Sequence, residues 1–205
     1  MPLPPPRVPR LLMRVWDAPT RLLHGAVVLL VIAAYATYRL GRMGLHDLAG
    51  DTLLALLLFR LAWGFVGSET SRFSAYLRSP VAGLSGKGPD AEVGHAAAGG
   101  WLVLALLLAL GAAVVTGLLA LGPPDRAAAR WHAISFYAVL ALAALHLACV
   151  AAYAAAGRRE LVQLMVTGKK RLPAATRQPR LSSPALALLV LVIAAGLAWA
   201  LVRLA

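Results

Sequence analysis

Residues 131–146, WHAISFYAVLALAALH, form an apolar stretch that carries two histidines, His132 and His146, fourteen positions apart. Fourteen residues of an α-helix turn through about 1400°, only about 40° short of four full turns, and rise about 21 Å. Both imidazoles are therefore expected on one face of the helix, at different depths. A histidine is costly inside hydrocarbon and usually faces a bundle interior, where it marks a functional site. The stretch predicts a membrane-spanning helix that could hold two stacked metal centres.

The composition of the whole chain is that of an integral membrane protein. Its 205 residues are 60% hydrophobic and 14% charged, a charged share well below that of an ordinary soluble domain. The net charge of +12 could suggest a nucleic-acid partner. The basic residues, however, lie between the apolar segments, and membrane topology explains them better because Lys and Arg gather in loops on the inner face. We expect no nucleic-acid binding.

Five segments have the length of about 20 residues that a bilayer core requires, and all are rich in Leu, Ala and Val. They are residues 19–40, 45–67, 94–121, 130–156 and 184–204. Asp17, followed closely by Pro19, is a typical start signal for the first helix. The predicted fold is an all-α integral membrane protein, with a four-helix transmembrane bundle and a fifth, C-terminal transmembrane helix.

The distribution of Lys and Arg predicts the orientation of these helices. With the N-terminus inside, fourteen Lys and Arg lie in inner segments and five in outer ones, while Arg60 falls within the second span. The positive-inside rule therefore favours a cytoplasmic N-terminus. The predicted divisions of the chain are a cytoplasmic N-terminal segment (1–18), a four-helix domain (19–156), a basic interfacial segment and linker (157–183), and the fifth helix (184–205).

The basic segment between the fourth and fifth spans has two parts. Residues 158–166, RRELVQLMV, alternate basic and apolar residues in a way that predicts a short helix along the inner interface. Residues 167–183 contain a further cluster of Lys and Arg and are predicted to be a linker. We interpret these charges as contacts with anionic membrane lipid in preference to a specific partner site.

The predicted topology sorts the histidines by depth. His46 and His132 open their helices at the outer face, whereas His24 and His146 lie in the inner half. One axial imidazole from each of two helices at the same depth is what a bis-histidine haem requires, and haem iron commonly takes imidazole ligands. Gly50, one turn after His46, would supply room for a flat macrocycle. Each histidine alone could instead be an interfacial residue, but that interpretation does not predict matched depths on different helices.

Two further residues are candidates for the inner site. His95 opens the third span at the inner face, where it could replace an inner ligand, donate to a haem propionate or lie near a quinone head group; a solvated helix start is an equal alternative. Arg60 follows His46 by fourteen residues, so it is expected on nearly the same face at the inner level. There it could pair with a propionate or extend to the inner interface.

Other metal centres are less consistent with the sequence. Zinc sites gather three or four ligands in one place, whereas these histidines are spread over about 20 Å. The single cysteine, Cys149, lies in an apolar stretch, and the sequence has no Cys-x-x-Cys-His motif. Covalently attached haem and iron–sulfur clusters are therefore not expected.

An ordered run of segments resembles a known family. They are RVWDAPTRLLH (14–24), FRLAWGFVGSETSRF (59–73), HAAAGGWLVLALLLALGAAVVTGLL (95–119), WHAISFYAVLALAALH (131–146) and GRRELVQLMVTGKKR (157–171). With them the chain resembles the bacterial cytochrome b-561 family, which includes the b-type cytochrome subunits of nickel–iron hydrogenases. Gly25, Ala96 and Ala97 depart from residues often seen in that family, and the fifth helix lies outside the resemblance.

The resemblance implies a protein of the bacterial inner membrane that binds two non-covalent haems b and moves electrons between the quinone pool and a redox partner. It implies that the axial ligands are His24, His46, His132 and His146. Ubiquinone or menaquinone would be the membrane carrier, so quinone oxidoreductase activity is one form the function could take. The partner would be a periplasmic cytochrome c or a soluble oxidoreductase subunit, and a homodimer is also compatible with the sequence.

Two alternatives belong to other classes of function. The chain could be a membrane anchor and electron-transfer subunit that connects a hydrogenase-like oxidoreductase to quinone. It could also be a haem-free structural or transport protein that uses its histidines for protons, in which case it would show no Soret band.

Overall fold

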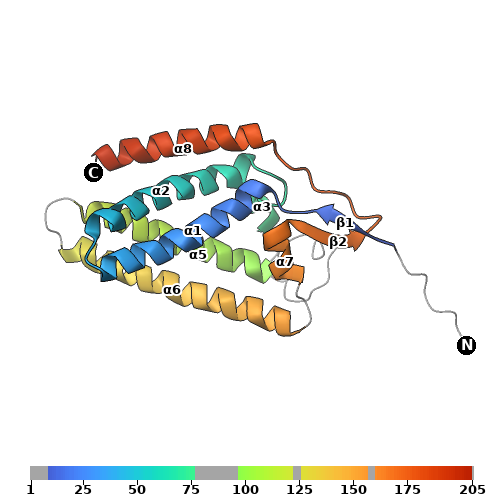
Figure 1. Ribbon diagram of the computed structural model, residues 1–205, viewed down its shortest axis with the longest axis horizontal. Helices are drawn as coiled ribbons and strands as arrows, with labels where there is room; N and C mark the ends of the chain where they lie inside the picture. The colour runs from blue at the N-terminus through green and yellow to red at the C-terminus, as the bar shows by residue number, and fades with distance from the viewer. Residues whose placement is uncertain (1–8, 77–96, 122–125, 157–159, 205) are drawn as a thin grey trace, which may run out of the picture.

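The computed structural model describes residues 9–76, 97–121, 126–156 and 160–204. Within these ranges five helices are long and apolar enough to cross a membrane, which confirms the five predicted spans to within a few residues at each described end. They are α1 (Ala18–Arg39), α2 (Met43–Val66), α5 (Ala97–Leu119), α6 (Arg126–Ala155) and α8 (Pro184–Leu204). They run side by side as an elongated bundle, so the all-α membrane fold is confirmed (Figure 1).

The first helix begins where the sequence predicts. Asp17 is its N-cap: Oδ1 accepts a hydrogen bond of 2.8 Å from the backbone N–H of Thr20, and a proline stands in the first turn. The other carboxylate oxygen, Oδ2, accepts a bond of 3.0 Å from the indole Nε1–H of Trp63 on α2. Asp17 and Trp63 are both buried, so one carboxylate caps α1 and also joins it to α2.

Two helical hairpins form the bundle. A short turn with Gly41 at φ 67° returns α2 antiparallel to α1, a backbone conformation that glycine adopts without steric cost. The second hairpin consists of α5 and α6. Backbone contact between the two hairpins runs mainly along α2 and α5. The central core accordingly contains Leu53 and Leu57 of α2, Leu110 of α5 and Val139 of α6.

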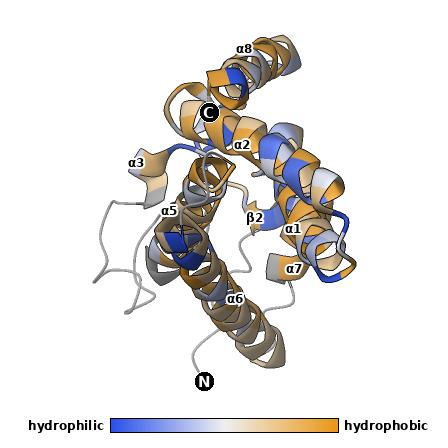
Figure 2. Ribbon diagram, turned by 90° about the vertical axis from the view of Figure 1, so that its left-hand side faces the viewer, coloured by the Kyte–Doolittle hydropathy of each residue, from blue (hydrophilic) through white to orange (hydrophobic). Residues whose placement is uncertain are grey.

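The fifth helix, α8, lies against α2 on the outside of the bundle (Figure 1). Its buried positions are the small residues Ala187, Ala194 and Ala198, which allow a close approach of the two helices. The long helices are coloured mainly as hydrophobic in Figure 2. Each of them exposes large apolar side chains; on α8 these include Leu188 and Val192. Exposed apolar surface of this kind on a long helix is what a hydrocarbon environment requires.

A small cap of two strands and two short helices covers one end of the bundle. Its strands were not predicted. Strand β1 (Arg10–Arg14) pairs antiparallel with β2 (Lys169–Pro173), with Arg10 opposite Pro173 and Arg14 opposite Lys169. The N-terminal segment and the linker were predicted without strands, because five-residue basic segments carry almost no periodic signal and become strands only by pairing with each other. Two short helices, α3 (Phe73–Tyr76) and α7 (Glu160–Thr167), complete this end.

The predicted interfacial helix at 158–166 is present as α7 within the described residues. Its Leu164 packs in a small core with Val15, Trp16 and Leu172, and Arg21 of α1 donates a hydrogen bond to the carbonyl of Val166. The helix is therefore fastened to the start of α1 and to the β1–β2 sheet.

Candidate functional site

His46 of α2 and His132 of α6 meet at the end of the bundle opposite the cap. Their ring centroids lie 5.9 Å apart and their ring planes are perpendicular, at 89°. Both side chains are half-buried. The two histidines that the sequence placed at the outer depth are therefore brought together from separate hairpins, 86 positions apart in the chain by subtraction of their numbers.

The distance between the two ring centroids is close to the distance expected for two imidazoles that bind one metal ion. With metal–nitrogen bonds of about 2.0 Å and a ring centroid about 1.1 Å behind each nitrogen, two opposed imidazoles have centroids about 6.2 Å apart. The observed 5.9 Å is close to that value. A perpendicular arrangement is also allowed, since each ring plane needs only to contain its own metal–nitrogen bond. The separation of the two rings therefore matches that of two imidazoles bound to one iron ion.

The hydrogen bonds of the two rings leave the same nitrogen available on each. Nδ1 of His46 lies 2.8 Å from the carbonyl oxygen of Ala34 on α1, and Nδ1 of His132 lies 2.8 Å from the carbonyl oxygen of Ala113 on α5. A carbonyl can only accept, so Nδ1 carries the proton in both rings and Nε2 keeps its lone pair. Histidines that bind metals are commonly held in this way, by a carbonyl on the nitrogen away from the metal.

Each acceptor carbonyl is also the longer of two contacts of a threonine hydroxyl, whose single proton is shared with the preceding carbonyl. Thr37 Oγ1 donates to Ala33 O at 2.7 Å and to Ala34 O at 3.0 Å. In the second hairpin Thr116 Oγ1 contacts the carbonyl oxygens of Ala112 at 2.6 Å and of Ala113 at 3.2 Å. The same arrangement, a threonine three residues after the acceptor alanine, thus occurs in both hairpins.

The threonines were missed in the sequence analysis, although a signal was present. Ala34 with Thr37 and Ala113 with Thr116 repeat an Ala-x-x-Thr spacing near the end of the helix that precedes each outer histidine. A threonine that bonds back to its own helix bends that helix locally, which tilts nearby carbonyls out of the regular ladder. The repeated spacing therefore marks two carbonyls that can accept an additional bond.

The immediate neighbours of the two rings differ. Tyr38 of α1 lies beside His46, with ring centroids 5.9 Å apart. Gly117 of α5 lies beside His132, and a Cβ at that glycine would be 3.1 Å from Nδ1 and 3.2 Å from Cε1 of the imidazole. Gly50, predicted to supply room after His46, has no atom within 4 Å of the position of a Cβ.

His24 of α1 and His146 of α6 lie further toward the cap than the outer pair. His24 is exposed and His146 is half-buried. From His132 to His146 the helix rises about 21 Å, so this second pair lies well separated from the first.

The two additional candidates have different outcomes. Arg60 is buried, with 5% of its surface exposed, and its guanidinium carbon lies 4.9 Å from the ring centroid of Phe73 in α3. This is a cation–π contact at the capped end of the bundle, the end at which the sequence placed it. His95 lies outside the described residues. Among the residues that the structure describes, no three His, Cys, Asp or Glu side chains gather as a metal cluster.

Comparison with known proteins agrees with these features. The model of the prokaryotic cytochrome b561 family matches residues 15–168, which is most of the chain. The chain belongs to this family. No curated protein and no solved structure matches it.

Membership in the prokaryotic cytochrome b561 family, together with the five apolar helices, establishes the general class of the protein. It is a multi-pass membrane protein and a b-type cytochrome that acts in electron transfer. The family match ends at Gly168, so strand β2 and helix α8 lie outside it.

Proposed function

We propose that this cytochrome holds two non-covalent haems b, stacked across the bilayer, with His46 and His132 as axial ligands of the outer haem and His24 and His146 as ligands of the inner one. The observation that carries the proposal is the outer pair, whose centroids lie 5.9 Å apart with both Nδ1 atoms bonded to carbonyls. When bound there, haem iron supplies a one-electron couple whose potential depends on its axial ligands and on local polarity.

The protein's own groups support this proposed site. The carbonyls of Ala34 and Ala113 fix the tautomer and orientation of His46 and His132, and each acceptor comes from the neighbouring helix of the same hairpin. The apolar helices around these half-buried rings lower the local dielectric constant. Arg60 and His95 are proposed to contribute positive charge or hydrogen bonds near the inner haem.

The electrons are proposed to pass between ubiquinone or menaquinone and a redox partner in the bacterial inner membrane, with the N-terminus in the cytoplasm. The distribution of Lys and Arg along the sequence, fourteen in the predicted inner segments against five in the outer ones, supports this orientation. The partner class is a periplasmic cytochrome c or the soluble subunit of an oxidoreductase. Quinol-dependent reduction of the protein in proteoliposomes tests the quinone step, and no reduction by either quinol would overturn it.

A reduced-minus-oxidised spectrum with pyridine haemochrome quantification tests the cofactor. Two haems b per chain are expected, and a protein that folds without a Soret band would overturn the proposal. His132→Ala and His146→Ala should each remove a different spectral component. Leu147→Ala is a matched control on α6, because Leu147 is exposed and should leave both components intact. Loss of one common component in both histidine variants would contradict the assignment of the two pairs.

A further inference from the structure

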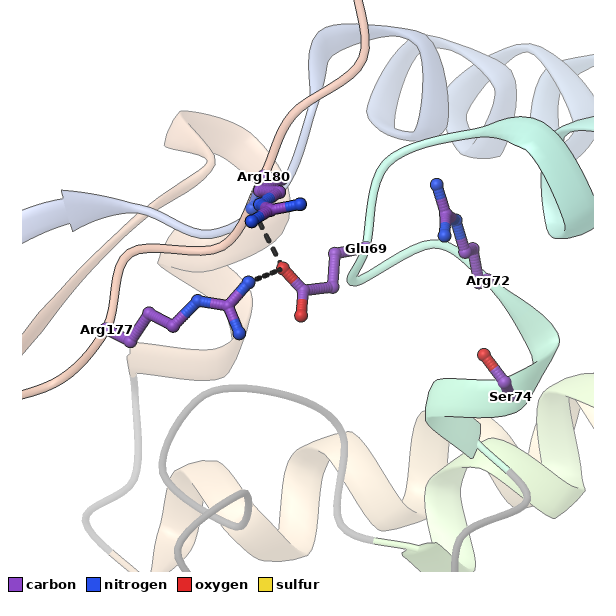
Figure 3. Close-up of a pocket in the computed structure, with 5 residues that line it drawn as sticks. All are labelled: Glu69, Arg72, Ser74, Arg177 and Arg180. Carbon is purple, nitrogen blue, oxygen red and sulfur yellow. Dashed lines mark hydrogen bonds and ion pairs between the residues drawn. The ribbon is translucent and has the colours of Figure 1, made fainter.

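A cavity of about 200 Å³ lies at the capped end, between the loop that follows α2 and the segment that leads into α8. Figure 3 shows the side chains that line it: Glu69, Arg72, Ser74, Arg177 and Arg180. None of these residues belongs to the histidine site. Arg177 and Arg180 also lie beyond the region that matches the family, so this chain builds the cavity partly from its own tail.

The cavity is a fixed feature of the fold, because hydrogen bonds join its two walls. The backbone N–H of Glu69 donates to Arg180 O at 3.0 Å, and the N–H of Arg180 donates back to Glu69 Oε2 at 3.0 Å. Next to this pair, the N–H of Ser182 donates to Oγ of Ser68 at 2.9 Å, and Ser68 is buried. The tail therefore follows the α2–α3 loop in a defined register.

The charge of the cavity is strongly positive. Three arginines and a single carboxylate line it, and Arg177 makes an ion pair of 3.3 Å with Glu69 (Figure 3). Arg72 is oriented by a bond of 2.9 Å from Nε to the carbonyl of Gly67, at the end of α2. One acidic side chain leaves an excess of two positive charges, and Ser74 adds a hydroxyl. Several arginines and a hydroxyl around one cavity are the donors that a phosphate group needs.

The depth of the cavity indicates the source of that phosphate. α2 ends at Val66 and α8 begins at Pro184, so the cavity lies where two apolar membrane helices meet the polar end of the bundle. This is the level of the lipid head groups. α8 continues with exposed Leu188, Leu189 and Val192, which offer apolar surface to acyl chains. Basic pockets beside transmembrane helices on the inner side are known to bind anionic head groups.

We propose that this cavity binds the phosphate of one anionic phospholipid and thereby fastens α8 and its linker to α2. The lipid would bring a negative charge to Arg72, Arg177 and Arg180 while its acyl chains lie along α8. A free phosphate ion has the same charge chemistry but gains nothing from the apolar surface.

Native mass spectrometry of the full-length protein tests the proposal. Phosphatidylglycerol is titrated against phosphatidylcholine, and wild type is expected to retain one phosphatidylglycerol per chain in preference. Arg177→Gln combined with Arg180→Gln should weaken that binding about tenfold, because both arginines are solvent-exposed and each charged contact then contributes only modestly. The matched control is Arg39→Gln with Arg42→Gln, which removes two charges at the opposite end of the bundle and should leave the binding unchanged.

Three results would overturn the proposal. They are equal retention of both lipids by wild type, equal weakening in the control double variant, and full displacement of the lipid by millimolar inorganic phosphate, which would identify a phosphate-ion site. If the variant with Arg177→Gln and Arg180→Gln does not fold, thermal unfolding of the wild-type protein tests the proposal. Phosphatidylglycerol should raise the melting temperature, whereas a mixture of phosphatidylcholine and inorganic phosphate should not. Haem content is not part of this readout, so failure here is separate from failure of the proposed function.

Discussion

Gly117 and His132 are in such close contact that a single added methyl group would reach the imidazole: a Cβ at Gly117 would lie 3.1 Å from Nδ1. That separation is shorter than ordinary van der Waals contact, and the same Nδ1 atom is bonded to Ala113 O, one turn earlier on α5. The absence of a side chain at residue 117 therefore allows the ring of His132 to lie close against α5 and bond to Ala113 O.

Gly117→Ala is expected to displace the ring of His132 and weaken the outer haem site. Overpacking of a tight site costs about 1–3 kcal/mol, so retention of the outer haem should fall by about tenfold or more. Haem titration of the purified variant measures this effect. Gly111→Ala is the matched control on the same helix, because a Cβ there meets no atom within 4 Å. Equal haem retention in both variants would contradict the positioning role of Gly117.

Thr37→Val and Thr116→Val are expected to lower the reduction potential of the outer haem. Without the hydroxyl, Ala34 O or Ala113 O becomes a stronger acceptor for the histidine Nδ1–H, which makes the imidazole more electron-donating and favours ferric iron. A neutral hydrogen bond contributes about 0.5–1.5 kcal/mol, equivalent to about 20–60 mV for one electron. Redox titration with separate spectral components measures the shift.

Thr52→Val provides the control for this experiment. Thr52 also donates its hydroxyl to the helix backbone, at 2.7 Å from Leu48 O, but Leu48 O is not the acceptor of either outer histidine. This variant should leave both potentials unchanged. A similar shift in all three variants would show a general effect of the helices and would remove the special role of Thr37 and Thr116.

Asp17→Ala is expected to destabilise the whole bundle. Loss of an N-cap costs about 1 kcal/mol, and the buried indole N–H of Trp63 would lose its acceptor at a cost of about 1–3 kcal/mol. The melting temperature in detergent should fall clearly below that of wild type. Asp17→Asn keeps a carbonyl oxygen for one of the two donors, so its melting temperature should lie between those of wild type and Asp17→Ala. If the Asp17→Ala variant had the same melting temperature as wild type, the link between α1 and α2 would not contribute to stability.

Gly168→Ala is expected to loosen the cap without unfolding the bundle. Gly168 has φ 71°, and a Cβ there would lie 2.6 Å from the carbonyl oxygen of Trp16. The left-handed conformation alone costs about 1–2 kcal/mol for an L-residue. Limited proteolysis should cut near β2 faster than in wild type, whereas Gly196→Ala, at an open position in α8, should behave as wild type. Unchanged cleavage would show that the cap tolerates the substitution.

The membrane fold could be predicted from the sequence because the hydrocarbon core of a bilayer requires a continuous run of apolar residues, which can be read directly along the chain. A helix such as α8, Pro184–Leu204, needs only enough consecutive apolar residues, and its predicted and observed bounds coincide. The pairing of His46 with His132 was likewise predicted from depth alone, since antiparallel helices of known length place their residues at calculable levels. The roles of these residues as ligands remain predictions.

The sequence alone determined which segments cross the membrane and which histidines share a depth, because helical rise and hydropathy depend only on local order along the chain. The tertiary structure alone decided the contacts across helices: the 5.9 Å pairing of His46 with His132, the carbonyls of Ala34 and Ala113 that orient them, and the β1–β2 pairing. It also joined Glu69 to Arg177 and Arg180, more than one hundred residues away. Such contacts depend on how helices rotate and pack, and no local pattern specifies that.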